Sequence, residues 1–156
     1  MLANIKNDLM YCLNILESLA KIKLYVGKSQ DAEEFYHLNE QLNFNATLTL
    51  FANIGETVTK LSPELKNKYP YIAWQQVKDF RNKVVHDYIG LDIYIVYNII
   101  IQELPPLTDN ILQIVEFELQ SQNFDLEEFK VAKNDFYYRH VPFERITYPQ
   151  KRNPPS

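Results

Sequence analysis

Three residues near the middle of the chain have side chains suited to chemistry on a phosphodiester. Arg81, His86 and Tyr88 lie within the run Arg-Asn-Lys-Val-Val-His-Asp-Tyr. Cleavage of RNA without a metal needs a group that moves protons and a cation that stabilises charge on the phosphorane. Histidine suits the first task because imidazole gains and loses a proton near neutral pH. Arginine suits the second because its planar fork makes paired hydrogen bonds and stays charged.

The spacing of this pair does not by itself bring the two side chains together. At about 100° per residue, positions five apart lie about 140° apart around an ideal helix. A bend near the helix end would bring Arg81 and His86 closer, and so would a twofold dimer that places two copies of the pair in one cleft. A dimer would also supply two imidazoles, one as acid and one as base. Spacing alone is equally compatible with an exposed Arg and a His that satisfies carbonyl groups at a helix end.

The remaining sequence predicts an all-α fold, an antiparallel helical bundle of about five helices. The chain has only three glycines among 156 residues, and apolar residues recur every three or four positions. We expect a helical-bundle domain over residues 1–120 and a C-terminal extension over 121–156, with one helical stretch near 125–137. The expected long helices cover residues 2–26, 45–60, 72–85, 92–103 and 108–120, with shorter helical segments within 31–40 and at 64–68.

Particular residues define the ends of these helices. Gly27 is expected to stop the first helix, and Ser62 with Pro63 is typical of a helix start. The pair Pro105-Pro106 is expected to end the fourth helix, and Thr108 to cap the last one. Gly55 lies inside the second long helix, where glycine costs up to about 1 kcal/mol relative to alanine. A close helix crossing or a bend at Gly55 would explain its presence.

Composition narrows the class of protein. The net charge is −4, yet residues 60–83 and 129–156 each carry six basic against two acidic residues, which fits a confined anion site or ordinary solvated surface. The single cysteine, Cys12, excludes an intrachain disulfide and is expected in the core. No stretch reaches the roughly 18 apolar residues of a membrane helix. We therefore expect a soluble cytoplasmic protein without a membrane segment.

The chemical motif and its neighbouring segments resemble a known family. Arg81-Asn82-x3-His86-x-Tyr88 is similar to the signature of the HEPN superfamily, in the Arg-x4-His-x-Tyr form of HepT-type toxins. The Ile-Gly-Glu sequence at 54–56, the segment from Leu61 through Trp74 and the Leu-Pro-Pro-Leu sequence at 104–107 resemble other parts of these toxins. The similarity covers roughly residues 12–115.

This resemblance implies a helical bundle that forms a homodimer, with the two motifs facing each other across a cleft. It implies a metal-independent endoribonuclease toxin that needs no cofactor. It also implies a cognate MntA-type minimal nucleotidyltransferase as antitoxin, which transfers AMP from ATP to Tyr88. Arg81 would contact the scissile phosphate and His86 would transfer protons. The RNA substrate, transfer RNA or messenger RNA, stays open.

Three further residues are candidates for a supporting role. Asn82 is polar and adjacent to Arg81. Asp87 could orient His86 or be a solvated acid, and Glu56 could make a polar contact near the cleft or a buried salt bridge with a neighbouring helix. Phe80 departs from the family pattern, because a smaller or more flexible residue is common at that position.

Two other functions compete with the ribonuclease toxin. The chain could be a non-catalytic HEPN subunit that binds nucleotides or a partner nucleotidyltransferase, or a plain helical interaction protein in which the motif is coincidental. The aromatic and basic residues between Phe129 and Tyr148 could contact single-stranded RNA, dock the nucleotidyltransferase, or simply pack onto the helical body. No partner for His140 is evident.

Overall fold

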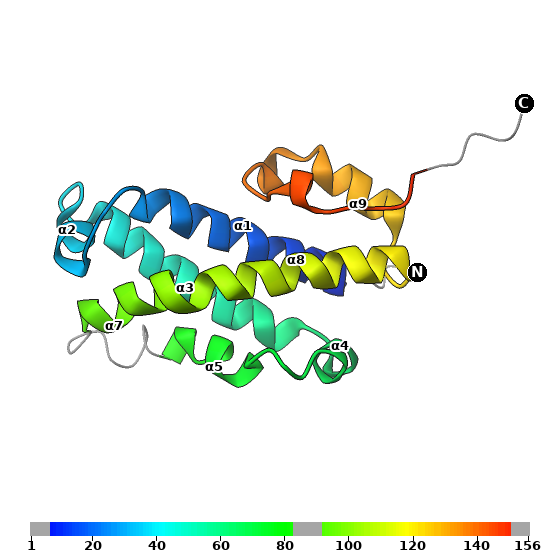
Figure 1. The fold of residues 1–156 in the computed structure, drawn as a ribbon, viewed down its shortest axis with the longest axis horizontal. Helices are drawn as coiled ribbons and strands as arrows, with labels where there is room; N and C mark the ends of the chain where they lie inside the picture. The colour runs from blue at the N-terminus through cyan, green and yellow to red at the C-terminus, as the bar shows by residue number, and fades with distance from the viewer. Residues whose placement is uncertain (1–6, 83–91, 151–156) are drawn as a thin grey trace, which may run out of the picture.

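The computed structural model describes residues 7–82 and 92–150, and throughout these residues the protein is helical, without strands. This confirms the predicted all-α fold. The bundle is built around three long helices, α1 (Asp8–Val26), α3 (Leu42–Lys60) and α8 (Leu104–Gln120). Helix α1 packs along α3 and also against α8 (Figure 1).

Several helix ends lie where the local sequence predicts them. Helix α1 ends at Gly27, which has a φ of 56° that glycine adopts without strain. The short helix α2 (Ala32–His37) is capped by the Asp31 side chain. Helix α4 (Pro63–Lys68) is capped by Ser62, whose hydroxyl accepts a hydrogen bond from the Leu65 N–H. The Asp8 carboxylate in turn accepts hydrogen bonds from the Ser62 N–H and hydroxyl, which joins the start of α4 to α1.

The third long helix is interrupted, contrary to the prediction of one helix from residue 72. Helix α5 (Trp74–Lys78) starts two residues later and gives way to a turn at Asp79, after which residues 80–82 are helical again. The Trp74 indole N–H donates to the carbonyl groups of Lys66 and Tyr69, so the segment before α5 is held as a turn. Residues 83–85 of the predicted helix lie outside the described residues.

The predicted helix break at Pro105-Pro106 is wrong. Helix α7 (Ile93–Asn98), the π-helical turn η2 (Ile99–Glu103) and α8 follow one another without a gap. The two prolines occupy the first turn of α8. In the π turn the Leu104 N–H donates to the Ile99 carbonyl, five residues earlier, so the hydrogen-bond register changes there. A residue in the first turn of a helix does not need its own N–H for a hydrogen bond within the helix, so prolines are tolerated at this position. Thr108 therefore lies inside α8, where its hydroxyl donates to the Leu104 carbonyl instead of capping a helix.

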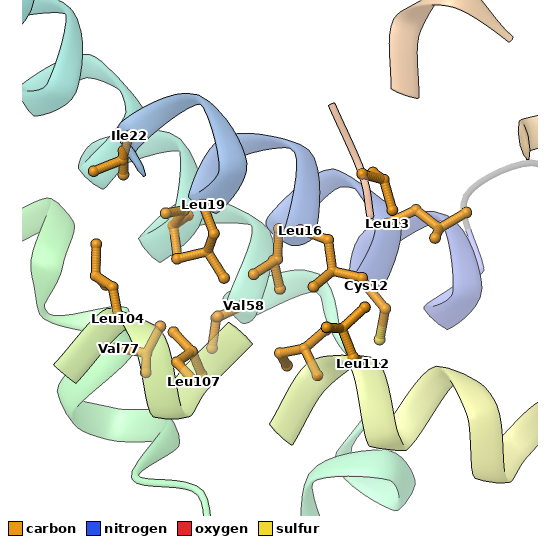
Figure 2. Packing of buried hydrophobic residues seen from close by; sticks show 14 of the residues in the cluster. Cys12, Leu13, Leu16, Leu19, Ile22, Val58, Val77, Leu104, Leu107 and Leu112 are labelled. Atoms are coloured by element: carbon orange, nitrogen blue, oxygen red, sulfur yellow. The ribbon is translucent and has the colours of Figure 1, made fainter. Parts of the chain in front are cut away.

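One apolar core joins these helices. Side chains from α1, α3 and α5 meet those of α8 in the centre of the bundle, as Figure 2 shows for Leu16, Val58, Val77 and Leu107. Cys12 lies in this core as predicted, and burial raises the pKa of its thiol. Among the described residues, none of the helices combines the length and apolar character needed to span a membrane.

The C-terminal extension contributes to the same core. Helix α9 (Leu126–Lys133) lies within the stretch predicted to be helical and is followed by two 3-10 turns, η3 (Phe136–Tyr138) and η4 (Phe143–Arg145). Buried side chains from this region belong to the core cluster of the bundle; they are Phe129, Ala132, Val141, Phe143 and Ile146. The rings at 136 and 137, by contrast, are exposed. The buried side chains of the extension therefore pack onto the helical body, whereas packing does not account for the exposed rings at 136 and 137.

We expect Phe129→Ala to lower the free energy of unfolding by about 3–5 kcal/mol, because the ring is fully buried and its loss leaves a cavity. Urea unfolding followed by circular dichroism measures this change. Phe136→Ala is the matched control: its ring is 75% exposed, so we expect a change within about 0.5 kcal/mol. Equal unfolding midpoints for Phe129→Ala and the wild type would mean that the extension is a separate unit, with the boundary near residue 120 that the sequence predicts.

Candidate functional site

Arg81 lies where two helices touch backbone to backbone. A Cβ atom added at Gly55 of α3 would lie 2.8 Å from the Lys78 carbonyl oxygen and 2.9 Å from the Arg81 amide nitrogen. Only glycine fits this contact, since real Cβ atoms essentially never approach backbone atoms so closely. The close helix crossing predicted at Gly55 is confirmed. It fixes the backbone of Arg81 relative to α3.

The residue after this glycine binds the arginine side chain. Glu56 Oε2 lies 2.9 Å from Arg81 Nη1, and the two side chains are 46% and 54% exposed. Glu56 therefore forms a partly exposed salt bridge with the candidate arginine, and its role at the site stays a prediction. An ion pair this exposed contributes little to stability. Its consequence is orientation, because the carboxylate attracts one end of the guanidinium while about half of the side chain stays open to solvent.

Phe80 explains how the segment is anchored from the other side. Its ring is almost fully buried and stacks on Phe51 of α3, with ring centroids 5.3 Å apart. The residue that departs from the family pattern is therefore a core residue, and it directs its neighbour Arg81 outward.

The structure brings together part of the predicted site. Asn82 is exposed, and its amide donates to Asp79 Oδ1 over 3.4 Å, a long contact. Arg81, Glu56 and Asn82 thus lie at one helix crossing. His86, Asp87 and Tyr88 lie outside the described residues, and their roles stay predictions.

A buried acidic site was not predicted. Glu118 of α8 is almost fully buried and accepts hydrogen bonds from the Tyr69 hydroxyl (2.6 Å) and the Asn123 amide (2.7 Å), and it forms an ion pair with Lys68 (2.7 Å). Burial by itself raises the pKa of Glu118, but these partners outweigh it and the pKa is lowered. Position 118 continues the helical spacing of the apolar positions 111, 114 and 115, so it lies on the apolar side of α8. An acidic residue at such a position is the sequence signal for a buried carboxylate. With every partner present, this cluster is structural.

His140 also has a partner that the sequence did not indicate. The carboxylate of Glu17 on α1, almost fully buried, lies 2.7 Å from His140 Nδ1 and accepts the His140 backbone N–H at 2.7 Å. The two positions are 123 residues apart, so no local pattern relates them. This contact joins the C-terminal extension to α1.

Within residues 7–82 and 92–150, no three acidic, histidine or cysteine side chains come together in a way that could hold a metal ion.

The fold and the crossing at Arg81 define a small helical-bundle protein with a half-exposed arginine at its surface. Comparison with protein families specifies the class further. The model of the family described as Ribonuclease HepT-like matches residues 15–114, which include Gly55, Glu56 and Arg81. The chain belongs to this HEPN-type family.

Individual relatives carry names in keeping with this family. Putative RNase MJ0125 of Methanocaldococcus jannaschii is 30% identical over 101 residues, which are 65% of this chain and 78% of that protein. Gamma-glutamylcyclotransferase and putative RNase MJ0434 of the same organism is 27% identical over 111 residues, 71% of this chain and 49% of that protein. Probable ribonuclease HepT of Thermococcus cleftensis is 28% identical over 54 residues, 35% of this chain and 49% of that protein.

The matched region spans about half the length of two of these three relatives. No solved structure matches the chain.

Proposed function

We propose that this chain is the cytoplasmic toxin of a type VII toxin–antitoxin system and acts as a metal-independent endoribonuclease on transfer RNA or messenger RNA. The observation that carries the proposal is the half-exposed Arg81, fixed at the Gly55 crossing and oriented by Glu56 within the region matched by the family. An arginine held in this way suits an incoming phosphodiester. The relatives named as ribonucleases support the same activity.

The proposed reaction uses Arg81 and His86. One imidazole accepts the proton of the 2′-hydroxyl as its oxygen attacks phosphorus, the bond from phosphorus to the 5′-oxygen breaks, and an imidazolium protonates that oxygen. Arg81 stabilises the charge on the phosphorane. Asn82 and Asp87 are proposed to orient these groups.

Two proton-transfer groups fit a composite site at a homodimer interface. Exposed apolar side chains on α7 and η2 support a second copy of the chain as partner, because large exposed patches mark interfaces. These are Tyr94, Ile95 and Ile101.

The second proposed partner is an MntA-type nucleotidyltransferase that silences the toxin by AMPylation of Tyr88. An AMP group brings bulk and a negative charge into the segment that follows Arg81. That charge would compete with the substrate phosphate for the guanidinium.

We expect Tyr88→Phe to remain toxic when it is co-expressed with the nucleotidyltransferase encoded beside it, because phenylalanine has no hydroxyl to modify. Growth is the first measurement. Intact-mass analysis is the second: the wild type should gain one or more AMP units and the variant none. Protection of the variant equal to that of the wild type would refute AMPylation of Tyr88 as the switch.

An alternative function is a non-catalytic subunit that binds nucleotides or the nucleotidyltransferase. Expression of the chain alone separates the two functions. Growth arrest that His86→Ala abolishes supports the ribonuclease, whereas normal growth supports the binding subunit.

A further inference from the structure

A shallow cavity of about 270 Å³ opens between α8 and the segment that joins α4 to α5. Its aromatic lining includes two rings that are largely in solvent, Tyr71 at 61% and Phe117 at 52% exposure. Exposed rings in a concave site are typical of ligand-binding surfaces. The full lining is Tyr69, Tyr71, Gln113, Glu116, Phe117 and Gln120.

The charges around this cavity favour an uncharged ligand group. The Lys68 ammonium lies 5.2 Å from the centroid of the Phe117 ring, but the buried Glu118 carboxylate neutralises it at 2.7 Å. The Glu116 carboxylate accepts a hydrogen bond from the Thr147 N–H of the C-terminal extension. A phosphate would find no uncompensated cation here, whereas a neutral planar group would meet two aromatic rings.

Two primary amides accompany the rings. Gln113 and Gln120 are exposed and lie seven residues apart on α8, with Phe117 between them on the same face. Amide side chains make paired hydrogen bonds with the edges of nucleobases, and aromatic rings stack on their faces. The lining therefore matches the chemistry of a nucleobase.

The position of the cavity relates it to Arg81. The segment between α4 and α5 that lines the cavity leads directly into α5, and α5 carries Lys78 and is followed by Arg81 (Figure 1). The residues from Tyr71 to Arg81 form a turn and then mostly helix, so the two positions are less than about 20 Å apart. A single strand bound over about 4–16 nucleotides has room for such a separation.

We propose that this cavity binds an unpaired nucleobase of the RNA, a few nucleotides from the phosphate at Arg81. The inference rests on the proposed ribonuclease function and specifies its substrate class as single-stranded or looped RNA. Bases in a continuous duplex are stacked and paired, so their faces are closed to Tyr71 and Phe117.

Binding of a labelled 12-nucleotide single-stranded RNA with 2′-O-methyl groups, followed by fluorescence anisotropy, tests the proposal. This RNA cannot be cut, because its 2′-oxygens are blocked. We expect Tyr71→Ala and Phe117→Ala each to raise Kd about ten-fold and Tyr71→Phe to stay near the wild type. Leu24→Ala removes a comparably exposed apolar side chain from α1 and should leave Kd unchanged. Trp74, the single tryptophan, provides a second signal close to the cavity.

The outcomes separate this inference from the proposed function. Kd values for Tyr71→Ala and Phe117→Ala equal to the wild type would overturn the base site, even if unmodified RNA is cut. Loss of nucleotidyltransferase binding in these variants with unchanged RNA binding would overturn it as well and assign the cavity to a protein partner. A ring-dependent Kd without cleavage of unmodified RNA would support the base site and refute the ribonuclease. A wild type that binds no RNA would refute both.

Discussion

Arg81→Ala and His86→Ala are each expected to reduce RNA cleavage by at least about 100-fold while the fold stays intact. Proton transfer by a positioned side chain typically contributes about 100- to 10,000-fold, and a guanidinium that stabilises the phosphorane has effects of comparable size. Gel analysis of labelled RNA measures cleavage, and circular dichroism measures the fold. Arg81 is exposed, so its loss should not disturb the core.

Controls make this result specific to the proposed mechanism. Arg81→Lys keeps the charge but loses the planar fork, so we expect partial activity. Lys23→Ala removes an exposed cation from the last turn of α1 and should leave cleavage unchanged. The wild type should cut RNA in the presence of EDTA. Full activity of either alanine variant, or an absolute need for a divalent metal, would refute the mechanism.

Gly55→Ala should lower the free energy of unfolding by about 1–3 kcal/mol and also reduce cleavage. The new methyl group would meet the backbone of Lys78 and Arg81 at less than 3 Å, so the helices must separate. Because Arg81 is fixed at this contact, its guanidinium should move with the backbone. Urea unfolding and the cleavage assay measure the two effects.

The sign of the stability change is the decisive readout. In a helix without the crossing, glycine to alanine would stabilise by up to about 1 kcal/mol. A more stable and fully active Gly55→Ala variant would show that the contact with α5 is not maintained in solution. Thr59→Ala, at an exposed position one turn later on α3, controls for general effects on this helix.

Local signals predicted local structure well. Gly27 and Ser62 define helix ends through side-chain or backbone chemistry confined to a few residues, and each lies where the sequence placed it. Gly55 was also informative, because a glycine in a helix interior costs stability and needs a compensating contact.

Signals that depend on the neighbouring structure were misinterpreted or missed. Pro105 and Pro106 read as a helix end, because sequence does not reveal the π turn before them. The pairing of His140 with Glu17 spans 123 residues and left no local trace.

At the candidate site, too, local sequence signals predicted one part of the structure, and another part depends on how the helices pack. The motif identified Arg81, and the close crossing at Gly55 could be predicted, but the ion pair with Glu56 depends on how two helices meet. From the sequence, two predictions for Glu56 stayed open, a polar contact near the site and a buried salt bridge.

The π turn has a consequence for how the protein tolerates insertions and deletions. It accommodates one residue more than an α-helical turn, so deleting one residue from Ile99–Glu103 would let α7 and α8 join as a regular helix. Because the wide turn absorbs the extra residue, this deletion should leave α7 in nearly the same orientation relative to α8. Tyr94 and Ile95 would stay exposed and Val96 would stay in the core. A deletion inside the regular helix α7 would instead rotate the residues on one side of it by about 100°, so a single-codon deletion should be tolerated in the π turn and not in α7.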